Sequence, residues 1–278
     1  MQEAERTAQA PIVPGRSYGF FTDTSLCIGC KACEVACKEW NGLPAEDAGL
    51  TGESYDNTSA LGATTWRHVT FVEKIDGPAG RATQLAPFQS NWLMASDVCK
   101  HCANAPCLEV CPTGAIFRTE FDTVVVQGDI CNGCGYCVPA CPFGVVELST
   151  ADGKAHKCTL CYDRMKGGFE PACAKACPTE SIQFGEVDVL TARAERRVER
   201  LRALGQPDAY LYGVPGGPGA TGGLRRLNAF FLLLDRPEVY GLPAAPSRGA
   251  ERIARGLGSG LLAMAGFALA ALVALRKR

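Results

Sequence analysis

The chain has 278 residues, which is enough for one or two domains with a hydrophobic core. Its 28 Lys and Arg residues nearly cancel its 29 Asp and Glu residues, so the overall charge does not indicate a nucleic-acid partner. The unusual feature is the presence of 16 cysteines, all of which fall into four groups of four. The groups are Cys27, Cys30, Cys33 and Cys37; Cys99, Cys102, Cys107 and Cys111; Cys131, Cys134, Cys137 and Cys141; and Cys158, Cys161, Cys173 and Cys177.

The spacing of the cysteines indicates which kind of site they form. Disulfide frameworks suit small secreted domains, whereas this chain is long, 47% hydrophobic and shows no secretory signal in residues 1–20. Zinc sites usually join two separated C-x2-C pairs, whereas the first and third groups read C-x2-C-x2-C-x3-C. In bacterial ferredoxins this spacing places three cysteines on one [4Fe–4S] cluster and the fourth, often followed by proline, on its neighbour. The sequence therefore predicts four [4Fe–4S] clusters, with all sixteen cysteines as iron ligands.

The pairing of the groups is not determined by spacing. The second, third and fourth groups follow one another closely enough to be neighbouring halves of ferredoxin-like units, while a long segment follows the first group. The second group can pair with the third and the first with the fourth. Alternatively, the first pairs with the second and the third with the fourth.

The segments between the groups predict a few secondary-structure elements. Residues 54–74 form an insert that ends in a strand pattern over 66–72, and we interpret it as a packing cover over a cluster pair. Residues 115–131 predict a hairpin between two cluster loops. Apolar, strand-like pairs recur after the closing cysteines of the second, third and fourth groups, which indicates an internal repeat. These pairs are residues 115–116, 145–146 and 181–182.

Beyond the last cysteine, residues 192–205 predict a basic helix with Val198, Leu201 and Leu204 on one side, solvated or facing a partner. The glycine-rich residues 213–223 follow no strand pattern and lack a Gly-Lys-Ser/Thr ending, so they predict a loop and not a phosphate site. The three histidines are scattered, and we expect none of them to be a ligand. They are His68, His101 and His156.

The last segment predicts a membrane anchor. Residues 256–275 contain no charge, and twenty residues in a helix span the hydrocarbon layer of a bilayer. Arginines precede this segment, and Arg276, Lys277 and Arg278 follow it. Gly256 and Gly260 lie at helical spacing on a face of small residues that allows another membrane helix to pack closely.

These parts predict an electron-transfer subunit without a catalytic centre. We find no nucleophile, acid–base pair or substrate motif beside the cysteines. Four clusters in one chain form a path for electrons, and the path needs a donor at one end and an acceptor at the other. The alternatives are a self-contained enzyme in which a cluster binds substrate, which the full complement of ligands disfavours, and a structural metal-binding module.

The cysteine groups, with these spacings, resemble the iron–sulfur subunits of membrane-bound molybdenum and tungsten oxidoreductases. Within that superfamily, five segments look like the β subunit of respiratory formate dehydrogenase, and the resemblance covers nearly the whole chain. They are GFFTDTSLCIGCKACEVACKEWN (19–41), SYDNTSALGATTWRHV (54–69), CKHCANAPCLEVCPTGAI (99–116), KCTLCYDR (157–164) and LNAFFLLLDRPEVYGLP (227–243). The equivalent subunit of a sister complex, acting on nitrate, sulfoxide, polysulfide or hydrogen, is the alternative.

The resemblance implies a ligand set for each cluster and an α+β fold of two bacterial-ferredoxin-like double-cluster units, one inserted in the other, followed by one transmembrane helix. The ligands would be Cys27, Cys30, Cys33 and Cys177 for cluster 1; Cys158, Cys161, Cys173 and Cys37 for cluster 2; Cys99, Cys102, Cys107 and Cys141 for cluster 3; and Cys131, Cys134, Cys137 and Cys111 for cluster 4. The expected division is a tail (1–20), the first group with its cover (21–98), the inserted unit (99–150), the fourth group (151–190), an extension (191–255), the anchor (256–275) and a basic tail (276–278).

The resemblance also implies partners. The unit of the first and fourth groups would face a catalytic subunit with a molybdenum or tungsten bis-pterin centre, and cluster 4 would lie nearest a cytochrome b subunit. Membrane lipid would surround the anchor, and we expect no nucleic acid. The expected location is the cell membrane, with the cluster domain on the outer, periplasmic face and a cytoplasmic C-terminus, since positive residues tend to remain inside.

Overall fold

The computed structural model describes residues 11–45, 49, 52, 55–73, 92–249, 251, 264 and 267. Helices and strands are mixed along the chain, as the α+β prediction requires. In order they are β1 (Tyr18–Asp23), α1 (Ala32–Asn41), β2 (Arg67–Glu73), β3 (Trp92–Val98), α2 (Pro106–Glu109), β4 (Ile116–Arg118), β5 (Val124–Val126), α3 (Cys137–Ala140), β6 (Glu147–Leu148), β7 (Ala155–His156), α4 (Tyr162–Lys166), α5 (Ala172–Lys175), β8 (Ile182–Glu186), α6 (Val187–Ala203), β9 (Tyr210–Tyr212), β10 (Ala229–Leu233) and the 3-10 helix η1 (Pro237–Tyr240).

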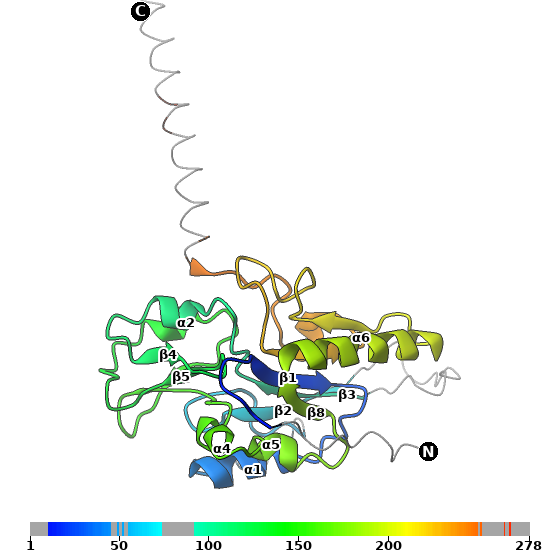
Figure 1. The fold of residues 1–278 in the computed structure, drawn as a ribbon, viewed down its shortest axis with the longest axis horizontal. Coiled ribbons are helices and arrows are strands. Elements are labelled where there is room, and N and C mark those ends of the chain that lie inside the picture. Colours follow the sequence, from blue (N-terminus) through cyan, green and yellow to red (C-terminus); the bar gives the residue numbers. More distant parts are fainter. Residues whose placement is uncertain are drawn as a thin grey trace, which may run out of the picture.

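A four-stranded sheet, in the order β8-β1-β10-β9, lies at the centre of the molecule (Figure 1). β1 and β10 are parallel, while β8 and β9 pair antiparallel at the two edges. The two central strands are fully buried, and their apolar runs YGFF and AFFLL are typical of strands that are covered on both faces. The sheet therefore joins the start of the described chain to segments far along the sequence.

Alternate side chains of the central strands enter two different cores. Phe21, Phe230 and Leu232 pack with α6, and the rings of Phe21 and Phe230 stack with their centroids 5.4 Å apart. Phe20 and Phe231 belong to the larger core, which includes the cysteine groups. Burial of each large apolar side chain stabilises the fold by about 1.5–3 kcal/mol. The sheet thus provides a rigid, apolar support for the cysteine loops.

Helix α6 begins earlier than the sequence predicted. The side chains that it buries are Val187, Leu190, Ala194, Val198 and Leu201. Leu204, which we expected on the same side, caps the helix and is 52% exposed. The prediction was wrong there because the helix ends at Ala203. The apolar side covers the sheet, while the charged side and Val189 face solvent.

The hairpin of β2 and β3 confirms the strand predicted over residues 66–72. β2 contacts α1, and both strands contact η1. Helix α1 also packs against α5, which brings the first cysteine group next to the fourth. In the same way α2 contacts α3, which brings the second group next to the third.

The predicted hairpin within residues 115–131 is present as β4 and β5. The predicted strand-like pairs are displaced by small amounts, because the strands begin at Ile116, Glu147 and Ile182. Val145 and Val146 are buried core residues before β6 and not strand residues. The glycine-rich residues 213–223 form turns, as predicted, but strand β9 directly precedes them where the sequence showed no strand pattern.

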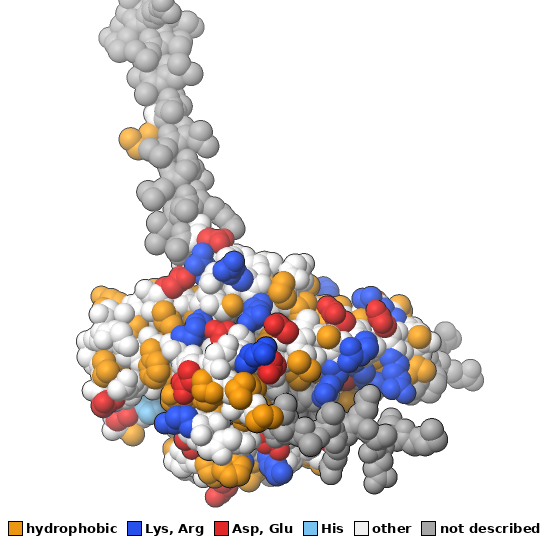
Figure 2. Space-filling model, in the orientation of Figure 1, with side chains coloured by type: hydrophobic (Ala, Val, Ile, Leu, Met, Phe, Trp, Pro, Cys, Tyr) orange, Lys and Arg blue, Asp and Glu red, His pale blue; other side chains and the backbone are white. Residues whose placement is uncertain are grey.

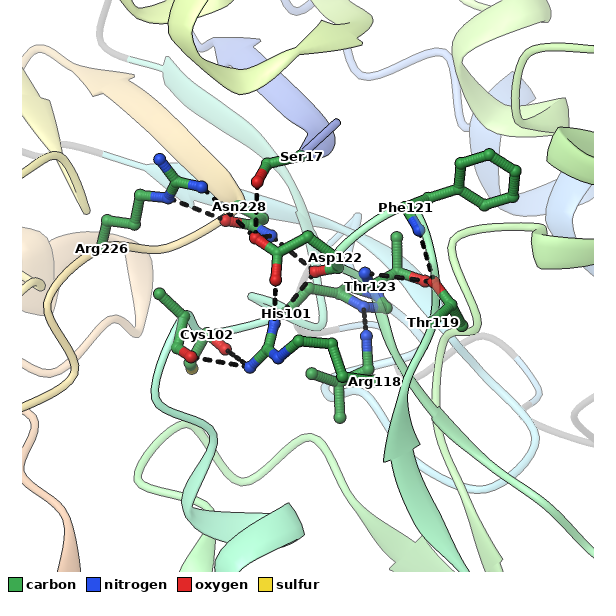
Figure 3. Close-up of polar contacts among 12 residues, drawn as sticks. Ser17, His101, Cys102, Arg118, Thr119, Phe121, Asp122, Thr123, Arg226 and Asn228 are labelled. Carbon is green, nitrogen blue, oxygen red and sulfur yellow. Dashed lines mark hydrogen bonds and ion pairs between the residues drawn. The ribbon is translucent and has the colours of Figure 1, made fainter. Parts of the chain in front are cut away.

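A polar network joins the β4–β5 turn to the starts of the two central strands, β1 and β10 (Figure 3). Asp122 lies at its centre, in a left-handed conformation with φ 60°. Its carboxylate accepts hydrogen bonds from Ser17 at 2.8 Å, Arg118 at 2.7 Å and the Asn228 amide at 3.2 Å, and it pairs with Arg226. Burial acts to raise the pKa of Asp122, but these donors hold it below its usual value.

No helix in the described part of the chain is both long and apolar enough to cross a membrane. The anchor predicted over residues 256–275 lies outside the described residues, apart from Met264 and Phe267. On the face shown in Figure 2, Lys and Arg side chains are interspersed with Asp and Glu side chains.

We expect Gly19→Ala to destabilise the sheet. A Cβ at Gly19 would lie 1.7 Å from the carbonyl oxygen of Asn228, which the Asp122 network holds in place. The strands must move apart, at a cost of about 1–3 kcal/mol or more, which a denaturant titration would measure. Gly249→Ala is the control, because its added Cβ meets no described atom within 4 Å. Equal stability of the two variants would contradict this close approach.

Candidate metal centres

The first two cysteines of each group are joined by the same kind of turn. In all four C-x2-C segments, the residue before the second cysteine has a positive φ. These residues are Gly29 (66°), His101 (43°), Gly133 (73°) and Leu160 (57°). Turns that combine right- and left-handed residues direct successive backbone N–H groups to one side and form concave sites for anions. The four loops therefore share a geometry suited to an anionic, sulfur-rich group.

Two of these positions also need glycine for space. A Cβ at Gly29 would lie 2.5 Å from the Met94 sulfur, and one at Gly133 would lie 2.3 Å from the carbonyl oxygen of Gly153. His101 and Leu160 adopt the left-handed conformation without glycine, and both side chains are buried. Such a conformation costs roughly 1–2 kcal/mol for a non-glycine residue, so packing must hold these two turns.

Helices position the later cysteines of each group. Cys33 and Cys37 lie in α1, so the fourth cysteine of this group has entered a helix, as its spacing suggests. The other groups differ, because their helices are short. Cys107, Cys137 and Cys173 lie in α2, α3 and α5, and Cys111, Cys141 and Cys177 follow the ends of those helices.

Two cavities are each lined by four cysteines from two groups. The first is lined by Cys27, Cys30, Cys33 and Cys177, among others. The second is lined by Cys99, Cys102, Cys107 and Cys141, among others. The structure thus brings together the residues of the predicted sets for clusters 1 and 3.

The other eight cysteines also gather in two sets. Burial, and then the thiols of Cys173 and Cys161, raise the pKa of Cys37 to about 12. Burial, and then the thiols of Cys37, Cys99, Cys173 and Cys161, raise the pKa of Cys158. The residues of the predicted set for cluster 2 are therefore neighbours.

The predicted set for cluster 4 is neighbouring too. Burial, and then the nearby thiols of Cys131, Cys134 and Cys111, raise the pKa of Cys137. Cys111 is different, because N–H groups of Ile116 and Thr113 outweigh its burial and hold its pKa below the usual value. This thiol accepts the kind of hydrogen bonds that stabilise a thiolate.

Thiols of different sets raise one another's pKa. Cys33 of the first set interacts with Cys173 of the second. Cys158 of the second set interacts with Cys99 of the third, and Cys107 of the third interacts with Cys137 of the fourth. The influence of these thiols on one another's pKa thus links the sets in the series 1, 2, 3, 4.

Within the described residues, no group of three or more His, Cys, Asp or Glu side chains is arranged to hold a metal ion. A four-iron cluster makes a different demand, because each cysteine binds a different iron atom at a corner of the cube. Its four thiolates surround a volume and do not converge on one ion. The four-cysteine cavities fit that requirement.

Three buried cations, which the sequence analysis did not identify, lie among the cysteines. Lys100 donates to the Val98 carbonyl at 2.7 Å and forms an ion pair with Asp97. Lys157 donates to the carbonyls of Val124 and Cys158. Burial acts to lower the pKa of Lys157, but the neighbouring thiols, with that of Cys99 first, hold it above its usual value.

The third cation is Arg67 of β2, which donates to the sulfur of Cys173 at 3.3 Å. A signal for two of the three was present in the sequence, because Lys100 and Lys157 each stand next to a cysteine. No such signal existed for Arg67, which comes from the insert that we interpreted as a cover.

The histidines have other partners. His68 pairs with Asp56 at 2.7 Å, and His156 pairs with Asp152 at 2.9 Å. His101 is buried and accepts a hydrogen bond from the Val124 N–H at 3.0 Å, while burial and then Lys157 lower its pKa. Arg118 supports the same turn by donating to the carbonyls of Cys102 and Ala103 (Figure 3).

Comparison with known families agrees with this arrangement. Residues 26–115 and residues 90–187 each match a model described as a 4Fe-4S dicluster domain. Together with the repeated loops and the gathered cysteines, these matches define the protein as a ferredoxin-like iron–sulfur protein with two dicluster domains. It binds [4Fe–4S] clusters.

Curated relatives identify the family more narrowly. The nitrate-inducible formate dehydrogenase iron–sulfur subunit of Escherichia coli is 41% identical over 81% of this chain and 71% of its own length. The formate dehydrogenase iron–sulfur subunit of Haemophilus influenzae is 39% identical over 81% of this chain and 68% of its own. The chain belongs to the family of formate dehydrogenase iron–sulfur subunits, which are electron-transfer and not catalytic subunits.

Relatives in other complexes are less similar. The thiosulfate reductase electron transfer subunit of Salmonella typhi is 37% identical over 69% of this chain and 84% of its own length. The B subunit of the anaerobic dimethyl sulfoxide reductase of Escherichia coli is 35% identical over 62% of this chain and 75% of its own. A sister complex therefore fits less well than formate dehydrogenase.

We expect Gly133→Ala to impair the loop of Cys131 and Cys134. The added Cβ would meet the Gly153 carbonyl, and alanine would also bear the strain of φ +73°. The variant should contain about four fewer iron atoms per chain than the wild type, as measured by anaerobic iron and acid-labile sulfide analysis.

Gly144→Ala is a control that separates the effect of backbone strain from that of a steric clash. Gly144 has φ +63°, but its added Cβ meets no described atom within 4 Å, so this variant should keep its iron. Equal iron content in the two variants would show that the tight contact at Gly133 is unimportant.

Proposed function

We propose that the sixteen cysteines hold four [4Fe–4S] clusters in the sets predicted above. Two cavities are lined by complete sets, and the thiols of the other two sets are mutual neighbours. Four-iron clusters bound there would supply one-electron transfer. The residues of the chain bind them, exclude water from the inner ones and fix their order.

The proposed sets make one double-cluster unit an insertion in the other. The contact between α1 and α5 supports the outer unit, which also includes the pairing of β1 with β8. The contact between α2 and α3 supports the inner unit. Both units then share the core that lies on one face of the sheet.

The two ends of the series differ from its middle in exposure, and this observation carries the proposed function. Cys30 and Cys134 are the exposed cysteines, and they belong to the first and the last set. Exposed apolar side chains lie near each of them. These are Ile28 and Val35 at one end, and Ile130 and Tyr136 at the other. Exposed aromatic and aliphatic residues of this kind are typical of interface cores.

The chain would therefore receive electrons at one end and deliver them at the other. We propose that the end at Cys30 faces a catalytic subunit that oxidises formate at a molybdenum or tungsten bis-pterin centre. The end at Cys134 would face a membrane cytochrome b subunit that reduces quinone. The names of the relatives support formate as the substrate of the complex.

The membrane location rests on the sequence of residues 256–275. This uncharged segment has the length of a membrane-spanning helix, and a helix there would keep the end at Cys134 beside its acceptor. We propose that the cluster domain lies on the outer face and that the basic tail remains in the cytoplasm.

We expect Cys134→Ser to separate two activities of the purified complex. Formate oxidation with an artificial dye that accepts electrons at the catalytic subunit should survive, while formate-dependent quinone reduction should fall at least tenfold. Gly128→Ala, close to the same loop but with no described atom within 4 Å of its added Cβ, should leave both rates unchanged. Equal loss of both activities in Cys134→Ser would contradict the proposed order, and absence of formate-dependent dye reduction in the wild type would contradict the substrate.

A chain that ends at Arg255 tests the anchor. The last ligand, Cys177, precedes the deletion by a wide margin, so the truncated chain should keep the iron content of the full chain. Without the apolar segment it should leave the membrane fraction, and quinone-linked turnover should fall with it. A truncated chain that stays in the membrane fraction with full quinone activity would refute the anchor.

A further inference from the structure

Arg67 is an unusual residue to find in this core. It is 1% exposed and is among the largest side chains that the protein buries completely. It begins β2, in the insert after the first cysteine group, and its guanidinium lies 4.7 Å from the centre of the Phe20 ring. Burial of a charge is costly unless an opposite charge and hydrogen bonds compensate it.

The hydrogen bonds of Arg67 lead to two different cysteine groups. Its Nη2 donates to the Cys173 sulfur at 3.3 Å, and its Nη1 donates to the Ser96 carbonyl at 3.2 Å. The Ser96 hydroxyl in turn lies 3.2 Å from the Cys33 sulfur. Cys33 belongs to the set of cluster 1 and Cys173 to the set of cluster 2. The guanidinium therefore lies between the two.

The described residues compensate the buried charge of Arg67 only in part. Among them, no carboxylate forms an ion pair with this guanidinium, and its Nε–H is buried without an acceptor. Thiols take the place of such a carboxylate, because those of Cys173, Cys33 and Cys158 raise the pKa of Arg67 against the effect of its burial. Buried donors without partners are rare in proteins and call for an acceptor, such as a bound ion or water.

We propose that Arg67 is the shared counter-charge of clusters 1 and 2 and raises the reduction potential of both. This inference rests on the proposed function, because it takes the four ligand sets as given. Reduction adds one negative charge to a cluster. A permanent positive charge in a region of low dielectric stabilises the reduced form more than the oxidised form. Removal of the charge must therefore make the potentials more negative.

The raised potentials of clusters 1 and 2 have a function in the electron path because of where Arg67 lies. Clusters 1 and 2 are the first two centres after the proposed catalytic partner. A cation between them favours acceptance of the electron at this end of the series. The insert is therefore more than a cover, because it places this charge inside the core. Arg67 acts through the clusters and not on the substrate, so it is a positioning and tuning residue.

The test is a redox titration of the complex, purified anaerobically with the full chain and monitored by electron paramagnetic resonance. In Arg67→Met, which keeps length and loses charge, we expect two of the four midpoint potentials to become more negative, by more than the spread of replicate titrations. Arg67→Lys keeps the charge and should shift them less. Arg202→Met is the matched control, because Arg202 lies on α6, donates to the Ala209 carbonyl and adjoins a core in which no described member is a cysteine.

Each outcome decides the proposal. Unchanged potentials in Arg67→Met, with full iron content, would overturn the proposal for Arg67 and leave the proposed function intact. A wild-type chain without four-iron clusters would refute the proposed function itself. If Arg67→Met loses iron, Arg67→Gln, which retains a planar polar head, is titrated in its place. Loss of iron from both neutral variants, with retention in Arg67→Lys, would assign Arg67 to cluster assembly and overturn its effect on the potentials. Equal shifts in the Lys and Met variants would also contradict a charge effect.

Discussion

The structure depends on one constraint: thiols of all four groups, which we propose as iron ligands, are gathered in and around a single core. Burial favours the protonated form of a thiol, and it raises the pKa of Cys33 and Cys107 to about 12. The protein opposes this effect with positive groups that it buries beside the sulfurs. Arg67 and Lys157 lie between ligand sets, and backbone N–H groups surround Cys111. The polar content of the core follows from this need.

The rest of the fold provides rigid support for the loops. One face of the sheet presents Phe20 and Phe231 to the cysteine core, and α6 covers the other face. Both faces of the sheet are therefore apolar. The four turns repeat one backbone geometry, with glycine at two positions where a neighbour leaves no space for a side chain. The Asp122 network then joins the turn of the inner hairpin to β1 and β10. Loop geometry is thereby determined by parts of the chain that bind no iron.

The sequence predicted those features that have a local pattern. Cysteine spacing indicated the loops, β-branched runs indicated β2 and the β4–β5 hairpin, and the family resemblance supplied the ligand sets that spacing had left open. The central sheet was not predicted, because its strands come from the two ends of the sequence and no local pattern reports their pairing. Leu204 was misplaced because periodicity does not show where a helix ends. Arg67 was missed because a buried cation in a strand has the same sequence pattern as an exposed one.

The position of β1 has a consequence for the way in which this chain is made. β1 forms its ladder with β8 and β10, so the strand that precedes the first cysteine loop has no partners until residues 182–233 have left the ribosome. The segment that contains the second and third groups is complete much earlier. With the groups paired as we propose, the inner unit can therefore acquire its iron during synthesis while the outer one is still open. The first cysteines to be translated are among the last to be enclosed.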